Sequence, residues 1–103
     1  MKILIVDDMP DNLSVLELML QKFGHAAVLA TNGAEALEKL RSEKFDMIIS
    51  DILMPVMDGY HFCCEVKNDK SLANIPFIFL SAIYNDKKDE ERALKVGADR
   101  YLA

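Results

Sequence analysis

Short apolar runs alternate along this chain with longer segments in which apolar residues recur at helical spacing. The strongest runs lie at residues 3–6, 45–50 and 75–80, and weaker ones lie at residues 26–30 and 100–103. The strong runs are rich in Ile, Val and Phe and lack strict alternation with polar residues, which is typical of strands buried on both faces of a parallel sheet. The pattern therefore predicts five strands.

The segments between these runs carry the signals of four helices. Pro10 stands where the first turn of a helix accepts proline, and Asn32 with Glu35 resembles a capping box. Gly24 and Gly97 follow helical stripes, at positions where glycine commonly ends a helix. The residues expected to face inward are Leu16, Met19, Leu20 and Phe23 in the first helix, Ala36, Leu37 and Leu40 in the second, Phe62, Cys63 and Val66 in the third, and Ala93, Leu94 and Val96 in the fourth.

Strands and helices alternate in this prediction, which begins and ends with a strand. Such alternation favours an α/β fold with a parallel sheet and right-handed crossovers. For five strands a common arrangement is the flavodoxin-like, doubly wound order 2-1-3-4-5. In that order the connections after residues 3–6 and 45–50 leave in opposite directions. A ligand crevice is therefore predicted at the carboxyl ends of these two strands.

Length and composition agree with a single domain that spans residues 1–103. The formal net charge of −5 argues against a surface for nucleic acid or for an anionic membrane. No apolar stretch approaches the roughly 20 residues of a membrane-spanning helix. Cys63 and Cys64 are adjacent and lack metal-ligand spacing, so reduced thiols and a cytoplasmic location are expected.

Acidic residues follow two of the predicted strands at the predicted crevice. Asp7 and Asp8 come directly after residues 3–6, and Asp51 comes directly after residues 45–50. Crowded carboxylates either keep a proton or recruit a cation. A small open site with oxygen ligands, and without His or Cys, suits Mg²⁺ better than Ca²⁺. The sequence therefore predicts that the three acids form a magnesium site.

A hydroxyl group is expected beside the same acids. Ser81 follows residues 75–80, where its hydroxyl and the backbone N–H groups after it can bind an anion held over Asp51. A carboxylate can attack phosphorus to form an aspartyl phosphate, and magnesium can neutralise the phosphoryl charge. The sequence has no Walker-type glycine loop, Ser-His-Asp set or HExxH motif. Together these groups predict phosphoryl transfer to Asp51.

Over essentially its whole length the chain resembles the receiver domain of two-component response regulators. The matching segments are ILIVDD at residues 3–8, SDILMPVMDG at 50–59, FIFLSA at 77–82 and GADRYLA at 97–103. The pattern Asp-x-x-Met-Pro-x-Met-Asp-Gly, which begins at Asp51, is highly specific, whereas a pair of aspartates alone is a weak signal.

The resemblance implies roles for the acids at the matching positions. Asp51 corresponds to the phosphoacceptor and Asp8 to a direct Mg²⁺ ligand. Asp7 corresponds to a second acid that acts on the metal directly or through water. The backbone carbonyl of Leu53 corresponds to the remaining protein ligand of the metal.

The resemblance also implies a conformational switch. Ser81 corresponds to the hydroxyl residue that moves toward the phosphoryl group, and Tyr101 to the aromatic residue whose ring reorients with it. The family's lysine after the last strand corresponds to the position after Ala103, and its fifth helix lies further on. The chain is therefore expected to be a receiver domain truncated before that helix, with apolar surface exposed beside the first helix and a tendency to self-associate.

The predicted function is a signalling switch that promotes only its own phosphorylation and dephosphorylation, and is not an enzyme. A sensor histidine kinase or a phosphotransfer protein donates the phosphoryl group, and an unknown output domain or effector responds. A homodimer is possible, and no direct contact with nucleic acid or membrane is expected. Two alternatives stay open: a Mg²⁺-dependent phosphohydrolase with an aspartyl-phosphate intermediate, and a non-phosphorylated pseudo-receiver that only binds proteins. Hydrolases of this kind need an Asp-x-Asp motif after the first strand, so that the second acid can protonate the leaving group. This chain has Asp7-Asp8-Met9 at that place.

Overall fold

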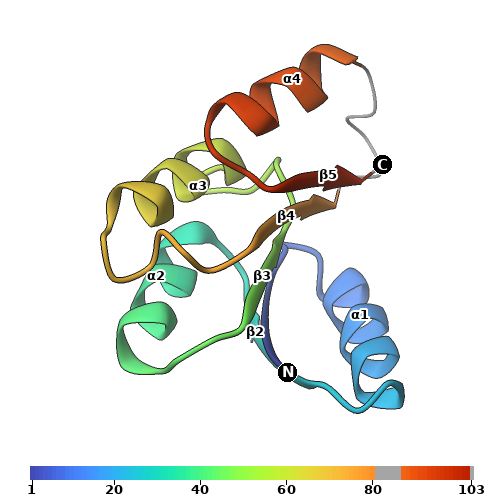
Figure 1. The fold of residues 1–103 in the computed structure, drawn as a ribbon. Helices are drawn as coiled ribbons and strands as arrows, with labels where there is room; N and C mark the ends of the chain where they lie inside the picture. The colour runs from blue at the N-terminus through green and yellow to red at the C-terminus, as the bar shows by residue number, and fades with distance from the viewer. Residues whose placement is uncertain (81–86, 103) are drawn as a thin grey trace.

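A computed structural model of the chain describes residues 1–80 and 87–102, in which strands and helices alternate (Figure 1). The strands are β1 (Lys2–Val6), β2 (Ala26–Ala30), β3 (Met47–Ser50), β4 (Phe77–Leu80) and β5 (Arg100–Leu102). The helices are α1 (Pro10–Lys22), α2 (Gly33–Ser42), α3 (Gly59–Asn68) and α4 (Lys87–Lys95). Every predicted element is present, although β3 and β4 begin two residues after the start of their apolar runs.

The five strands form one parallel sheet in the order β2-β1-β3-β4-β5. This confirms the predicted flavodoxin-like order. Because β1 lies between β2 and β3, the connections that leave β1 and β3 diverge at the carboxyl ends of the strands. The register pairs Val6 with Ser50, so Asp7 and Asp51, the next residue of each strand, leave the sheet side by side.

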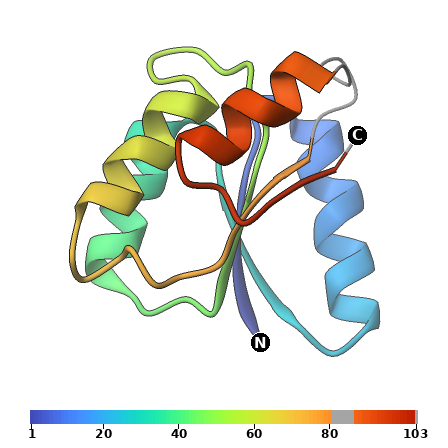
Figure 2. The same ribbon diagram turned by 45° about the horizontal axis from the view of Figure 1, so that its top comes forward.

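Helices α2, α3 and α4 lie on one face of the sheet, and α1 lies on the other (Figure 2). The larger core cluster contains the fully buried rings of Phe62, Phe77 and Phe79. The ring centroids of Phe62 and Phe77 are 5.3 Å apart, and those of Phe77 and Phe79 are 5.0 Å apart. The smaller cluster, on the α1 side, has Ile3, Ile5 and Leu13 as its buried members among the described residues. The two faces of the sheet are therefore buried unequally.

Side chains cap the first turns of α2 and α3. Asn32 Oδ1 accepts a hydrogen bond from the Glu35 N–H at 2.8 Å, and Asp58 Oδ1 accepts one from the His61 N–H at 2.8 Å. Such caps satisfy N–H groups that have no partner inside the helix. The Asn32 half of the predicted capping box is confirmed. The Glu35 carboxylate instead accepts a bond from the Thr31 hydroxyl at 3.0 Å.

Helix α4 packs against α3 through an aromatic ring. The Tyr60 ring meets Phe79 edge-on, with 5.6 Å between centroids, and the guanidinium of Arg92 lies 4.2 Å from its centroid. A cation over an aromatic face is attracted by the electrons of the ring. Ala93 is fully buried as predicted, but Leu94 is exposed. The face of α4 that packs against the rest of the domain therefore includes Ala93 but not Leu94, and is narrower than the predicted inward face.

The inward face of α1 also differs from the prediction. Leu16 and Leu20 pack on the smaller cluster as expected, and Leu13 is buried beside them. Met19 and Phe23, however, are 53% and 72% exposed. Within the described ranges α1 is the only helix on its face of the sheet, so these two side chains have no neighbouring helix to pack against (Figure 2).

Candidate functional site

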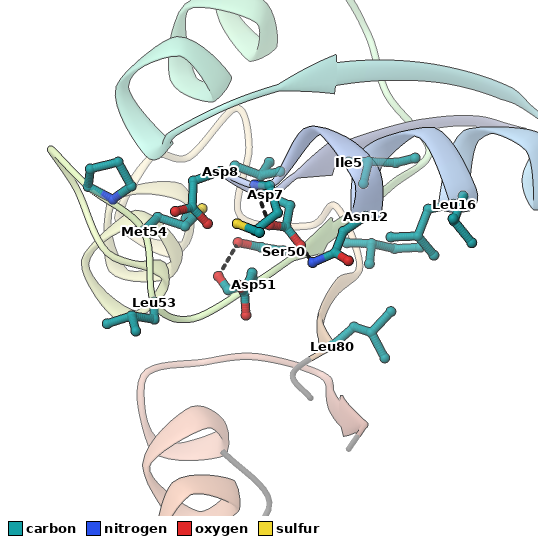
Figure 3. Close-up of a pocket in the computed structure, with 15 residues that line it drawn as sticks. Ile5, Asp7, Asp8, Asn12, Leu16, Ser50, Asp51, Leu53, Met54 and Leu80 are labelled. Carbon is teal, nitrogen blue, oxygen red and sulfur yellow. Dashed lines mark hydrogen bonds between the residues drawn. The ribbon is translucent and has the colours of Figure 1, made fainter. Parts of the chain in front are cut away.

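Three carboxylates meet at the carboxyl end of the sheet (Figure 3). Asp7 and Asp8 follow β1 and Asp51 follows β3, and one oxygen of each lies within 4.8 Å of the other two. The backbone N–H of Asp51 donates to the Val6 carbonyl at 2.9 Å, which extends the pairing of β1 with β3 into the site. The convergence expected from the strand order is therefore present.

Asp7 is the most buried of these acids, with 7% of its surface exposed. Its Oδ1 accepts a hydrogen bond from the Met9 N–H at 2.9 Å, and its Oδ2 accepts one from Nδ2 of Asn12 at 3.2 Å. Burial raises the pKa of Asp7 above its ordinary value, the two bonds oppose this rise, and the nearby charge of Asp8 adds to it. A cation bound here would offset both the burial and the repulsion.

Asp51 is half-buried, and its Oδ1 accepts a hydrogen bond from the Ile52 N–H at 2.8 Å. Burial raises the pKa of Asp51 from 3.8 to about 6, the Ile52 bond opposes the rise, and the charges of Asp7 and Asp8 add to it. The Ser50 hydroxyl donates to the backbone carbonyl of Asp51 at 2.8 Å. The result is a positioned carboxylate that is more basic than usual yet mostly ionised at pH 7.

The loop after β3 holds the backbone of Asp51 against the start of α3. The Gly59 N–H donates to the Ile52 carbonyl at 2.6 Å. A Cβ on Gly59 would lie 2.7 Å from the Ile52 Cα and would also meet the Asp51 backbone carbonyl, so this approach requires glycine. Val56 has a φ of 70° and is 83% exposed, an unfavourable conformation for a β-branched residue. The motif at residues 51–59 therefore shapes the backbone around the carboxylate.

A cavity of about 830 Å³ opens at the three acids (Figure 3). Asn12 contributes a further polar group to its lining. The apolar lining comes from β1, α1, β3, β4 and the loop after β3, and includes Val15, Leu16, Ile49, Leu53 and Leu80. The cavity thus continues from the acids onto the face of the sheet beside α1.

The donor set fits a hard divalent cation. The acid cluster consists of the carboxylates Asp7, Asp8 and Asp51, and neither His nor Cys belongs to it. Oxygen ligands suit Mg²⁺ and Ca²⁺, whereas zinc and copper sites usually include nitrogen or sulfur. The side chains are therefore of the kind that can hold a magnesium ion.

Leu53, Tyr101 and Ser81 are the other residues that were expected to act at the site. Leu53 lies in the loop after β3 beside the acids, and its side chain is 54% exposed. Tyr101 lies in β5, paired in register with Phe79, and packs half-buried against the larger core. Ser81 lies outside the described residues. The roles expected for these three residues stay predictions.

Two polar residues of the site were not predicted. Asn12 bonds Asp7 from the first turn of α1, and Ser50 bonds the Asp51 backbone from the last position of β3. An amide in the helical turn after paired aspartates is a usable signal for the first. Ser50 ends an apolar run, and nothing in the sequence marks it as a residue of the site. Its complete burial, seen in the structure, is what identifies it.

Both cysteines are free thiols, as expected. Cys63 is fully buried, and burial raises its pKa to about 12, with the charge of Lys67 opposing the rise. Cys64 is only partly buried, and neither residue belongs to the acid cluster.

Comparison with known proteins places the chain among two-component proteins. A family model described as "Response regulator receiver domain" matches residues 3–103. The probable transcriptional regulator ycf27 of Guillardia theta is 40% identical over 101 residues, which are 98% of this chain and 38% of that protein. The alkaline phosphatase synthesis transcriptional regulatory protein PhoP of Bacillus subtilis is 34% identical over 101 residues, 98% of this chain and 41% of that protein. The chain thus spans about two fifths of the length of these relatives.

Solved structures agree with the family match. The receiver domain of a signal transduction histidine kinase from Syntrophus aciditrophicus has a TM-score of 0.89 and 40% identity, covering 98% of this chain and 76% of that chain. Chemotaxis protein CheY4 of Vibrio cholerae has a TM-score of 0.92 and 32% identity, covering 99% of this chain and 84% of that chain.

Proposed function

This chain belongs to the response regulator receiver domain family, and on that premise we propose that it is a phosphorylation switch in which Asp51 accepts the phosphoryl group. As a receiver domain it is generally a signalling module and not a true enzyme. The observation that carries the proposal is the acid cluster. The Asp51 carboxylate follows β3 within 4.8 Å of oxygens on Asp7 and Asp8, at the divergence point of the sheet.

The transfer step is a nucleophilic attack by the Asp51 carboxylate on phosphorus. The Ile52 N–H fixes Oδ1, and we assign the attack to Oδ2. A bond forms from this oxygen to phosphorus while the phosphorus–nitrogen bond of a donor phosphohistidine breaks. The departing imidazole keeps the electron pair and takes a proton from solvent.

The three acids would hold the cation that this transfer requires. Asp8 and Asp51 would bind it directly, Asp7 would act directly or through water, and the Leu53 carbonyl would supply a further oxygen. Bound Mg²⁺ would neutralise charge on the phosphoryl group and on the crowded acids. The oxygen-only donor set supports this assignment.

Readout of the phosphorylated state uses Ser81 and Tyr101. The Ser81 hydroxyl donates a hydrogen bond to a phosphoryl oxygen, and the movement of Ser81 changes the packing of the Tyr101 ring. The pairing of Tyr101 with Phe79 in neighbouring strands supports this path, because β4 leads directly to Ser81. Helix α4 and strand β5 form the face that changes.

Partners follow from family membership. A receiver domain implies a cognate histidine kinase, and we propose that this kinase or a phosphotransfer protein supplies the phosphoryl group in the cytoplasm. Among the described residues no helix has the length and apolar character needed to cross a membrane. We expect an output domain or effector to respond, with homodimerisation as one form of response and without direct contact between this domain and nucleic acid.

Incubation of the protein with Mg²⁺ and a small acyl phosphate tests the proposal. Intact mass spectrometry should show one added phosphoryl group, which disappears in Asp51→Asn and when a chelator removes the cation. Asp58→Asn is the matched control, because it makes the same change in the same loop and asparagine also caps helices well. This control should still be phosphorylated.

Three other outcomes would contradict the proposal. An adduct that persists in Asp51→Asn would place the acceptor elsewhere. Repeated turnover of unrelated phosphate esters would indicate a phosphohydrolase. No adduct under any condition would indicate a protein-binding module that is not phosphorylated.

A further inference from the structure

A groove of about 660 Å³ lies between α3 and α4, which are neighbours on one face of the sheet (Figure 2). The charged side chains that line it are the cations Lys67, Lys88, Arg92 and Lys95 and the acid Glu91. The chain as a whole has a net charge of −5, so this lining has the opposite sign to the whole molecule. Among the described residues that line the groove, none belongs to the acid cluster. The groove is therefore a separate, positively charged place on an acidic domain.

One of the four cations is fully engaged within the fold. The ammonium group of Lys67 donates to the backbone carbonyls of Ala73 at 3.1 Å and Ile75 at 3.2 Å, and to Oδ2 of Asp99 at 3.3 Å. These contacts use all the N–H donors of an ammonium group. A ligand in the groove must therefore be bound by the cations of α4.

The other three cations form a row along α4. Lys88, Arg92 and Lys95 are separated by four and by three residues, which places them on the same face of a helix. At a rise of 1.5 Å per residue the row is about 10 Å long. Within residues 1–80 and 87–102, none of these three charged groups forms an ion pair. Like charges in a row repel one another, and an anion bound along the row relieves this repulsion.

Arg92, the middle cation of the row, is held in position by a ring from α3. Its guanidinium carbon lies 4.2 Å from the centroid of the Tyr60 ring, and Tyr60 is buried. Stacking occupies the flat face of a guanidinium and leaves the N–H groups at its edge available. These groups form a fixed fork that matches two oxygens of a phosphate group. Arg92 is therefore positioned to bind phosphate, with a lysine about one turn away on either side.

We propose that the groove between α3 and α4 binds a small anion with two linked phosphate groups, either free pyrophosphate or the diphosphate of a nucleotide. The Arg92 fork binds one phosphate group, and Lys88 and Lys95 bind oxygens of both groups. A second phosphate group supplies more negative charge and more oxygens, so that both lysines are engaged together with Arg92. This inference goes beyond the proposed function and does not depend on it, because the acids of the phosphorylation site lie outside the groove.

Isothermal titration with pyrophosphate in a chelating buffer tests the proposal. Without a divalent cation the acid cluster repels the same anion, so binding reports on the groove. The wild type should bind one pyrophosphate saturably at about millimolar concentration or below, and inorganic phosphate about tenfold more weakly. Arg92→Gln should weaken pyrophosphate binding about tenfold, and Lys88→Gln or Lys95→Gln about threefold. Glu91→Gln should strengthen it about threefold, because it removes the one acid of the lining.

A matched control and a second titrant complete the experiment. Lys87→Gln makes the same charge change on α4 at a residue that does not line the groove, and should leave the affinity unchanged. ADP that binds more tightly than pyrophosphate supports a nucleotide as the ligand. ADP that binds no more tightly supports the free anion.

Three outcomes would overturn the proposal: no saturable binding of pyrophosphate to the wild type, full affinity in Arg92→Gln, or equal losses in Arg92→Gln and Lys87→Gln. Circular dichroism establishes that each variant is folded. If Arg92→Gln does not fold, Glu91→Gln decides the question, because a gain in affinity cannot arise from unfolding. An affinity of Glu91→Gln no higher than that of the wild type would then overturn the proposal.

Discussion

Ionisation of Asp51 is less favourable in the folded protein than in the unfolded chain, because its carboxylate is half-buried and lies beside two other acids. The backbone bond from Ile52 compensates only in part, since the pKa of Asp51 is still raised to about 6. Asp7 has its own raised pKa, chiefly from burial. Among residues 1–80 and 87–102, no Lys or Arg forms an ion pair with these acids, so the site holds negative charge that an added cation can neutralise.

Asp51→Asn is expected to stabilise the protein at pH 7 when no divalent cation is present. The folded protein binds the Asp51 proton more tightly than the unfolded chain does. Stability from this group is therefore complete below pH 3.8 and is lost as the pH rises through about 6. Because solvent screens a half-exposed carboxylate, we expect the free energy of unfolding to rise by only about 1 kcal/mol.

Urea unfolding in a chelating buffer at pH 7 and at pH 4 measures this effect. The difference between Asp51→Asn and the wild type should nearly close at pH 4, where the folded protein already holds the proton. Asp58→Asn serves as the control for loss of one negative charge in the same loop. A variant less stable than the wild type at pH 7 would contradict the expectation.

Part of the site could be predicted residue by residue. Asp7, Asp8 and Asp51 were predictable because parallel strands end at one edge of the sheet, and strand order decides which ends are neighbours. Asn12 was not predictable in the same way. Its contact with Asp7 depends on how the first turn of α1 is placed over the strand end, and apolar periodicity carries no information on that placement.

At the scale of elements, the junction between β3 and α3 depends on the absence of a side chain at Gly59. The first residue of α3 approaches the backbone of Asp51 and Ile52 so closely that a Cβ would meet main-chain atoms, which cannot rotate away. Gly33, the first residue of α2, would meet mainly the flexible side chain of Met57, at 2.9 Å. The two glycines thus differ in what surrounds them.

Gly59→Ala is expected to destabilise the protein by about 1–3 kcal/mol, because overpacking forces the backbone to shift. The same shift displaces Asp51, so phosphorylation by a small acyl phosphate should slow strongly. Gly33→Ala is the matched control and should cost less while keeping phosphorylation. Thermal unfolding and intact mass measure the two effects, and equal behaviour of the two variants would argue against the close approach.

Elements were more predictable than their packed faces. All five strands and four helices follow from apolar runs, helical spacing and caps such as Asn32. The exposed positions of Met19, Phe23 and Leu94 did not follow, because a periodic stripe shows only that a face can be buried. Whether it is buried depends on which other element lies beside it.

At the scale of the whole molecule, the two faces of the sheet are covered unequally. Three helices lie on one face and α1 alone lies on the other within the described ranges (Figure 2). Val15, Met19 and Phe23 are exposed along one flank of α1, and the apolar part of the cavity adjoins this helix. The described helices leave this apolar flank uncovered.

The 103-residue chain alone is expected to bind a dye that fluoresces on apolar surfaces and to self-associate at high concentration, because this flank stays exposed. Dye titration and analytical ultracentrifugation measure the two properties. Met19→Lys with Phe23→Lys should reduce both, whereas Leu94→Lys on α4 serves as a control for an exposed apolar residue elsewhere. A monomer with low dye binding would contradict the expectation.

The contact of Tyr60 with Arg92 gives the protein an optical signal of its own. The chain contains three tyrosines and no tryptophan, so its near-ultraviolet absorption comes mainly from tyrosine. The Tyr60 ring contacts both Phe79 and the Arg92 guanidinium of α4. In the sequence Tyr60 directly follows Gly59, the glycine that lies against the Asp51 backbone. A displacement of α4 relative to α3 changes the electric field at this chromophore. Near-ultraviolet circular dichroism can therefore follow motion of the two helices without an added label.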